Sequence, residues 1–261
     1  MRALQIAATG MSAQQMRVEV ISNNLANMST TGYNARRAEF ADLMYQQATR
    51  PGTVTANDGT IVPAGVQLGL GVRPTAVSVT LAQGSLSATG GDLDLAIDGK
   101  GYFEVTLPSG ASAYTRDGGF KRSANGDVVT SDGYPLVPGI TIPNGANTIA
   151  INADGEVYAY FTNQIQPTQI GTITLAEFTN EKGLEAIGSN NFLETEASGP
   201  PAVSTPGVDG LGTLKQGYLE DSSVDAVREI TELIKAQRGY EMNAKVITAA
   251  DEMLSATTQV R

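Results

Sequence analysis

The sequence predicts an α+β protein with long N- and C-terminal helices packed as a coiled coil, an extended linker with a β-hairpin, and a central antiparallel all-β domain. The N-terminal segment carries a seven-residue apolar repeat, the C-terminal segment shows helical apolar spacing, and the middle consists of short β-prone runs separated by turn pairs. We therefore expect a terminal helical domain (1–32 and 222–261), a linker domain with a hairpin near 45–65 (33–74 and 212–221), and a central β domain (75–211).

The N-terminal repeat covers residues 1–28. Two heptad positions, three residues apart, hold Leu4, Met11, Val18 and Leu25, and Ala7, Gln14, Ile21 and Met28. Seven of these eight residues are apolar, which is typical of a coiled-coil seam. The segment's only charged residues are Arg2, Arg17 and Glu19. A helix with a free outer face carries more charge than this, so the pattern favours burial in a polymer over intramolecular packing alone.

The C-terminal segment, about residues 222–260, predicts the second long helix. Ser222 is expected to cap it, with Asp225 completing a start that resembles a capping box. Apolar residues recur at helical spacing. The side chains expected to pack between helices or subunits are Ile230, Leu233, Tyr240, Ile247 and Leu254, together with Leu4, Met11, Val18, Ile21, Leu25 and Met28.

The middle of the chain predicts antiparallel β structure. The expected strands are 75–81, 93–97, 101–107, 148–151, 156–161 and 171–178. The pairs that suit tight hairpins are Asp98-Gly99, Asp117-Gly118, Asn125-Gly126, Asp132-Gly133 and Asp154-Gly155.

The composition narrows the range of functions. The net charge is −10 and the pI is near 4.5, which argues against a nucleic-acid partner. The chain has no cysteine, which excludes a disulfide framework and a thiolate metal site, and no histidine, the commonest general base. No run approaches the ~20 apolar residues of a membrane span, and the N-terminus lacks the pattern of a cleaved signal peptide.

The acidic and glycine-rich patterns of the middle do not complete a catalytic or metal-binding motif. A calcium loop at Asp92, Asp94 and Asp98 lacks the EF-hand spacing, and Gly99-Lys100-Gly101 lacks the flanking residues of a phosphate loop. The carboxylates that a histidine-free glycosidase could use are Asp117, Asp132, Glu104 and Glu177. Nothing in the sequence pairs them, so we expect no enzyme, no cofactor and no metal; a monomeric carbohydrate-binding or hydrolytic β domain with helical arms is the alternative.

Four motifs, in order along the chain, resemble the flagellar basal-body rod and hook family. They are SNNLANMSTTGY (22–33), LDLAIDGKGYFEV (93–105), YTRDGGF (114–120) and QRGYEMNAKVI (237–247). The residues that carry the terminal motifs are Asn23, Asn24, Asn27, Thr31, Gly32, Tyr33, Gln237, Arg238, Tyr240 and Asn243. The resemblance implies a structural subunit that forms a helical homopolymer.

The same resemblance implies where the subunit works and what it touches. Residues 45–74 look like the long linker insertion of distal rod subunits, which stiffens the rod; a proximal rod paralogue is the alternative. The turn of this insertion holds Pro51, Gly52, Asn57, Asp58 and Gly59. The implied partners are the protein itself, proximal rod subunits, hook subunits, the surrounding outer-membrane and peptidoglycan rings, and the flagellar export apparatus. The implied location is the basal body in the periplasm, after export without a cleaved signal.

Overall fold

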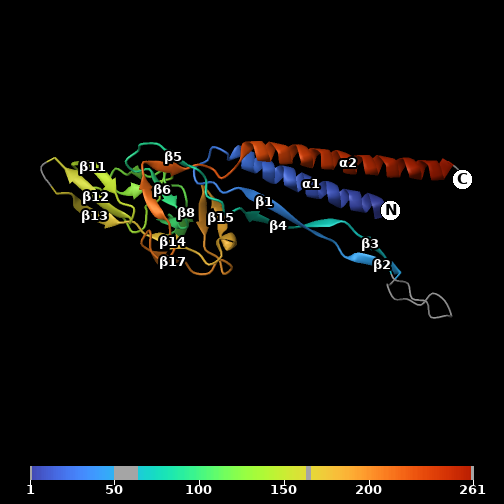
Figure 1. Ribbon diagram of the computed structural model, residues 1–261, viewed down its shortest axis with the longest axis horizontal. Coiled ribbons are helices and arrows are strands. Elements are labelled where there is room, and N and C mark those ends of the chain that lie inside the picture. The colour runs from blue at the N-terminus through green and yellow to red at the C-terminus, as the bar shows by residue number, and fades with distance from the viewer. Residues whose placement is uncertain (1, 50–63, 163–165, 260–261) are drawn as a thin grey trace. The chain divides into compact units, whose positions relative to one another are not determined.

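The computed structural model describes residues 2–49, 64–162 and 166–259. It is α+β, with one helix near each end and a β-rich middle (Figure 1). The chain divides into two compact units. The helical unit comprises Met1–Leu25, Arg36–Ser78 and Asp225–Arg261, and the β-rich unit comprises Ala26–Ala35 and Val79–Val224.

The helical unit combines two helices with paired strands. Helices α1 (Arg2–Ala26) and α2 (Ala226–Gln259) lie side by side (Figure 1). The strands are β1 (Arg36–Asp42), β2 (Tyr45–Thr49), β3 (Val66–Gly69) and β4 (Val72–Val79). Strand β1 pairs with β4, and β2 pairs antiparallel with β3.

The end of α1 and the start of α2 differ from the sequence prediction. The expected cap at Ser222 is wrong, because α2 begins one turn later and the Oδ1 atom of Asp225 accepts the N–H groups of Val227 and Arg228. The heptad repeat reaches Met28, but α1 ends at Ala26, so Met28 lies in the turn that follows.

Six strands form the largest sheet of the β-rich unit, in the order β15-β16-β8-β7-β14-β17. Their bounds are β7 (Tyr102–Thr106), β8 (Ser112–Thr115), β14 (Leu175–Glu177), β15 (Glu185–Gly188), β16 (Asn191–Leu193) and β17 (Ala202–Ser204). A short 3-10 helix, Glu181–Gly183, precedes β15.

Smaller sheets complete this unit. A three-stranded sheet has the order β11-β12-β13, and two-stranded ladders join β18 to β6, β19 to β5 and β10 to β9. Their bounds are β5 (Leu86–Ala88), β6 (Leu95–Asp98), β9 (Lys121–Arg122), β10 (Val128–Val129), β11 (Ala146–Ile151), β12 (Glu156–Phe161), β13 (Thr168–Thr172), β18 (Thr213–Gln216) and β19 (Tyr218–Glu220).

The predicted run 171–178 is not one strand. It divides between β13 and β14, which belong to different sheets. The side chain of Ile173, between them, is only 1% exposed. Burial of this connecting residue explains why the apolar run continues where the strand stops.

Alternate residues of β7 contribute to two apolar cores. Phe103 and Val105 belong to a large core, while Tyr102 belongs to a smaller one. The large core also contains Leu95, Ile97, Leu136, Ile140, Ile142, Val157, Ile173 and Leu175; the smaller core also contains Tyr114, Ala176 and Phe178. The central sheet is therefore covered on both faces in this region.

Some of the predicted turn pairs join two paired strands, and others do not. Asp154-Gly155 joins β11 to β12, and Asn125-Gly126 joins β9 to β10. Asp98-Gly99 does not close a hairpin, because β6 pairs with β18 and not with β7. A local turn signal cannot report that a partner strand comes from a distant part of the sequence.

Candidate polymerisation interface

Small residues allow α1 and α2 to approach each other closely. A Cβ atom placed on Gly10 would come 2.9 Å from the Nδ2 atom of Asn243, and one on Gly239 would come 3.2 Å from the Cδ atom of Gln14. From Gly10 to Gln14 the contact moves four residues along α1, while the partner moves four residues back along α2. The two helices are therefore antiparallel with a constant register at these contacts.

The face of α1 that meets α2 is partly polar. Along this face lie Ala7, Gly10, Gln14, Arg17, Ile21 and Asn24, which recur at heptad spacing. The predicted seam shares Ala7, Gln14 and Ile21 with it. The other predicted stripe flanks this face and is half-buried throughout, at Leu4, Met11, Val18 and Leu25.

An ion-pair network lies on the same face. Glu232 of α2 pairs with Arg17 of α1 and, at 2.8 Å, with Lys235 one turn along its own helix. The hydrogen bond from Lys235 and the charge of Arg17 lower the pKa of Glu232 below its ordinary value. Because the side chains of Glu232, Arg17 and Lys235 are 27%, 40% and 62% exposed, water screens the network, which fixes the positions of the side chains more than it stabilises the fold.

Asn24 joins three segments of the helical unit at the end of α1. Its Nδ2 group donates to the backbone oxygen of Arg36 at 2.8 Å and to the carboxylate of Glu229 at 3.2 Å. Its Oδ1 atom accepts the N–H of Arg36 at 2.9 Å. The side chain is only 1% exposed, so this amide replaces water with defined protein contacts.

The side of α2 that α1 leaves uncovered carries large apolar residues. Val227 is 76% exposed, and Ile230 and Ile234, three and seven residues further, are 46% and 45% exposed. Exposed apolar residues continue along the helix at Tyr240, Met242, Val246 and Met253. Of the other predicted packing residues, Leu233, Ile247 and Leu254 are half-buried and Met28 is exposed.

The remaining terminal-motif residues shape the chain segment that follows α1. Thr30 donates to the side chain of Asn27 at 3.2 Å, and the backbone oxygen of Thr31 accepts from Asn190 at 2.7 Å. The backbone oxygen of Tyr33 accepts the N–H of Ser223 at 3.0 Å. These contacts tie the segment to the rest of the β-rich unit, to which it belongs. The side chains of Asn23, Gln237 and Arg238 are exposed.

Position 32 is suited only to glycine. Its φ angle is +65°, and a Cβ atom there would lie 2.8 Å from the carbonyl carbon of Arg116 and 2.9 Å from the amide nitrogen of Asp117. Its N–H donates to the backbone oxygen of Glu220 at 2.8 Å. Both the left-handed conformation and the close backbone approach exclude a side chain.

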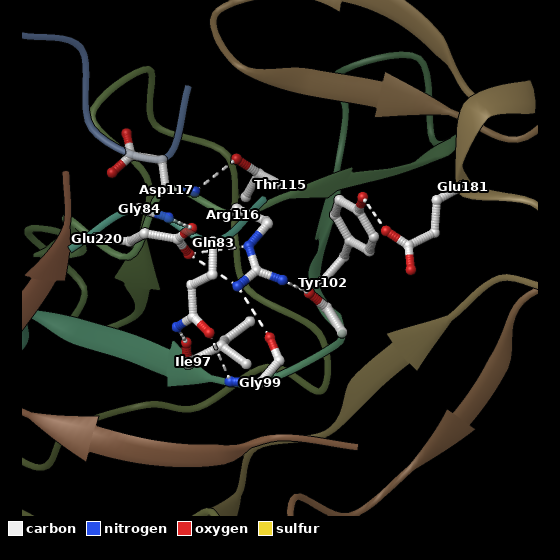
Figure 2. A network of polar contacts seen from close by, with 11 residues as sticks. Gln83, Gly84, Ile97, Gly99, Tyr102, Thr115, Arg116, Asp117, Glu181 and Glu220 are labelled. Atoms are coloured by element: carbon white, nitrogen blue, oxygen red, sulfur yellow. Dashed lines mark hydrogen bonds and ion pairs between the residues drawn. The ribbon is translucent and has the colours of Figure 1, made fainter. Parts of the chain in front are cut away.

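The side chains of Arg116 and Glu220 form a buried polar network beside Gly32. The sequence did not reveal this network. The Nε group of Arg116 donates to Glu220 at 2.9 Å, and its two Nη groups donate to the backbone oxygens of Gly101 and Gly99 at 3.0 Å (Figure 2). The other carboxylate oxygen of Glu220 accepts the N–H of Gly84 at 3.0 Å.

Tyr102 lies next to this network and bonds to another segment. Its hydroxyl donates to Glu181 at 2.9 Å, and its ring lies 5.9 Å from the guanidinium carbon of Arg116 (Figure 2). Burial, followed by the negative charge of Glu181, raises the pKa of Tyr102 far above its ordinary value. The hydroxyl therefore remains a donor throughout the physiological pH range.

The predicted rigidity turn, Pro51, Gly52, Asn57, Asp58 and Gly59, lies outside the described residues. The strands on either side of it, β2 and β3, are paired. Large apolar side chains are exposed at and beside these strands, at Met44, Tyr45, Val66, Leu68 and Leu70.

Other kinds of site are scarce in the described ranges. Within residues 2–49, 64–162 and 166–259, no group of three or more acidic residues could hold a metal ion. Neither α1 nor α2 combines the length and the hydropathy that a membrane-crossing helix needs. A cleft of about 710 Å³ in the β-rich unit is bordered by Lys100, Tyr102, Arg116 and Glu181. Tyr102, Arg116 and Glu181 already hydrogen-bond within the protein, and Lys100 lies 3.8 Å from the carboxylate of Glu177.

Three family models match the chain. They describe a flagella basal body rod protein (residues 4–34), a flagellar hook protein FlgE/F/G D1 domain (96–159), and a flagellar basal body rod FlgEFG protein C-terminal region (215–260).

Full-length relatives agree with these matches. The flagellar basal-body rod protein FlgG of Caulobacter vibrioides is 55% identical over the whole of both chains. The proteins of the same name from Agrobacterium fabrum and Buchnera aphidicola subsp. Schizaphis graminum are 51% and 47% identical, covering 98% of this chain and 97% and 98% of their own lengths.

Proposed function

This chain belongs to the flagellar basal-body rod protein family and is a structural subunit of the distal rod, and we propose that its copies assemble through their terminal helices into a rigid helical tube. Proteins of this family are structural, which implies a non-enzymatic role. The relatives do not favour a proximal rod paralogue or a monomeric carbohydrate-active domain.

The observation that carries this proposal is the uncovered apolar side of α2. Val227, Ile230 and Ile234 are at least 45% exposed although they are large and aliphatic. A soluble monomer rarely leaves a contiguous apolar patch in water, and such a patch is typical of an interaction surface. A second copy that covers this side would bury these residues.

The outer face of α1 supports the same proposal. This helix has 25 residues, of which only Arg2, Arg17 and Glu19 are charged, and Arg17 already pairs with α2. A helix with so few charges is suited to being surrounded by other helices. In our proposal, its half-buried stripe of Leu4, Met11, Val18 and Leu25 packs as a coiled coil in the assembled tube.

Repetition of one such contact generates the polymer. A head-to-tail interface whose rotation does not close a ring produces an open helical array. The proposed tube transmits torque from the motor to the hook and encloses the export channel. Its proposed neighbours are proximal rod subunits, hook subunits, and the ring proteins of the peptidoglycan and outer membrane, reached after export into the periplasm without a cleaved signal.

The β2–β3 ribbon is the proposed brace of the rod. A two-stranded ribbon is marginally stable alone, and this one exposes Met44, Tyr45, Val66 and Leu68. Contact with an adjacent subunit would cover these side chains and resist bending. Deleting residues 46–63 should therefore give a more flexible polymer, visible as curvature in electron micrographs; straight rods would argue against the brace.

Removal of residues 1–25 tests the proposal as a whole. The truncated chain should not polymerise, by sedimentation and electron microscopy, while its β-rich unit keeps a cooperative unfolding transition. Filaments that still form, or a β-rich unit that unfolds, would contradict the proposal. Limited proteolysis of the unassembled full-length chain is a second test, because termini that await neighbours should be cut readily.

A further inference from the structure

We propose that Asn24 is the residue that sets the axial register of α1 against α2, and that it thereby positions the helical unit for assembly. The second part of this inference rests on the proposed function, whereas the first part concerns the single chain.

Apart from the solvent-accessible ion pair of Arg17 with Glu232, the remainder of the α1–α2 contact discriminates weakly between registers. Its close approaches involve Gly10 and Gly239, which have no side chain, and the flexible amides of Gln14 and Asn243. Glycine accepts many neighbours, and long polar side chains adjust to a shifted partner. The heptad spacing also means that a slip of seven residues, about 10 Å, returns the same stripes to contact.

One such slip keeps the small residues matched. If α2 moved seven residues along α1, Gly10 would meet Ala250 in place of Asn243, and Asn24 would meet Ala236 in place of Glu229. Glycine against alanine is an acceptable close contact. The helix pair thus has an alternative register whose main cost along most of its length is the loss of the solvent-accessible Arg17–Glu232 pair, a small contribution.

Asn24 opposes that alternative. In the observed register its amide donates to Glu229 of α2 while both its polar atoms pair with the backbone of Arg36. Facing Ala236, the same buried amide would lose its hydrogen bond to Glu229, and the carboxylate of Glu229 would lose this donor. A single buried asparagine can specify register in helix pairs in this way, because giving up a hydrogen bond between a buried amide and a carboxylate is unfavourable.

The absence of cysteine allows a direct measurement of register. In the full-length unassembled chain, a Gly10→Cys/Asn243→Cys pair reports the observed register, and a Gly10→Cys/Ala250→Cys pair reports the slipped one. Each pair is combined with Asn24, with Asn24→Leu, or with Gln15→Leu, which makes the same kind of change on the exposed face of α1. Disulfide yield is compared after mild oxidation.

We expect the observed-register pair to cross-link with Asn24 and with Gln15→Leu. With Asn24→Leu, its yield should fall at least several-fold and the slipped-register pair should gain. Equal yields of the observed-register pair with and without Asn24 would overturn the proposal, because the connecting segments would then set the register. Loss of both cross-links would overturn it too, since Asn24 would then only hold the helices together.

A conservative pair of variants adds a rescue. Asn24→Asp places a second carboxylate against Glu229, so the observed-register cross-link should fall; adding Glu229→Gln supplies an amide donor to the new carboxylate and should restore much of it. No recovery would contradict the proposed role of this contact. Polymerisation of the Asn24→Leu chain is measured separately. A slipped register with normal filaments would refute only the proposed link between register and assembly. The proposed function is tested by another chain, the one that lacks residues 1–25, which should form no filaments.

Discussion

Arg116 and Glu220 form an ion pair inside the β-rich unit, where their side chains are 7% and 3% exposed. The pair is 104 residues apart in sequence and uses its remaining hydrogen-bonding groups on the backbones of Gly84, Gly99 and Gly101. Segments from both ends of this unit therefore meet at one charged contact. Complete pairing of both ions is the condition under which burying them is tolerable.

Removing one ion should destabilise the β-rich unit strongly. Arg116→Ala leaves the Glu220 carboxylate buried without its partner, so we expect a loss of about 3–5 kcal/mol in the free energy of unfolding. Urea denaturation measures this loss. Lys215→Ala, which breaks the half-exposed pair with Asp98, is the control and should cost no more than about 1 kcal/mol. Equal effects of the two changes would contradict the buried pair's role.

Gly32→Ala should lower the free energy of unfolding by much more than the positive φ angle of this residue alone would cause. The φ angle of +65° makes alanine unfavourable by about 1–2 kcal/mol, and the backbone of Arg116 and Asp117 blocks the added methyl group at under 3 Å. Gly90 is the matched control, since its φ angle is +71° and nothing lies within 4 Å of a Cβ atom placed on it.

The difference between Gly32→Ala and Gly90→Ala in thermal or urea unfolding isolates the effect of the close approach. We expect Gly32→Ala to lose at least about 1–3 kcal/mol more than Gly90→Ala, the range typical of overpacking. Equal losses would show that conformation alone selects glycine at position 32.

The sequence predicted both terminal helices and the β-rich middle because their periodicities are local. Of the two predicted stripes of α1, the one with Ala7, Gln14 and Ile21 lies on the face that meets α2. The sequence did not predict that Gly10 and Asn24 share this face, because apolarity favoured Leu4, Met11 and Val18. The reason lies in α2, where Gly239, Asn243 and Glu229 match the small and polar residues, and a pattern within one helix carries no information about its partner.

Contacts between distant segments were also invisible in the sequence. Arg116 follows β8 and Glu220 ends β19, and no spacing rule connects them. Similarly, the pairing of β6 with β18 could not be inferred from the turn signal at Asp98-Gly99. The family motif did point to Asn24 and Gly32, but only the structure gives their physical roles.

Replacing Asp117 by asparagine should stabilise the β-rich unit at neutral pH. Burial, with repulsion from Asp132 and Asp94, raises the pKa of Asp117 above its ordinary value, although the N–H of Gly119 donates to it at 3.0 Å. A raised pKa means that the native state favours the neutral form. The stability that the neutral form of Asp117 contributes is therefore complete below the unfolded-state pKa near 4. It is lost as the pH rises through the higher pKa of Asp117 in the native state.

Asp117→Asn keeps an oxygen for the Gly119 hydrogen bond and removes the charge. Its unfolding free energy should exceed that of the parent chain at about pH 7, and the gain should vanish below about pH 4, where the aspartate is neutral in both states. Urea titrations at the two pH values measure both effects. A variant less stable than the parent at neutral pH would show that the charge strengthens the Gly119 bond by more than burial costs.

The uncovered side of α2 should be required for assembly and not for folding. Ile234→Lys places a charge where the side chain is 45% exposed, so it should leave monomer stability within about 0.5 kcal/mol. In the polymer the same lysine would be buried against a neighbouring copy without a partner, which is strongly unfavourable.

Val208→Lys is the matched control, because Val208 is 47% exposed on the β-rich unit. Sedimentation and electron microscopy should show loss of filaments for Ile234→Lys and normal filaments for Val208→Lys. Filaments from both variants would remove this side of α2 from the interface, and loss in both would indicate a general effect of added charge.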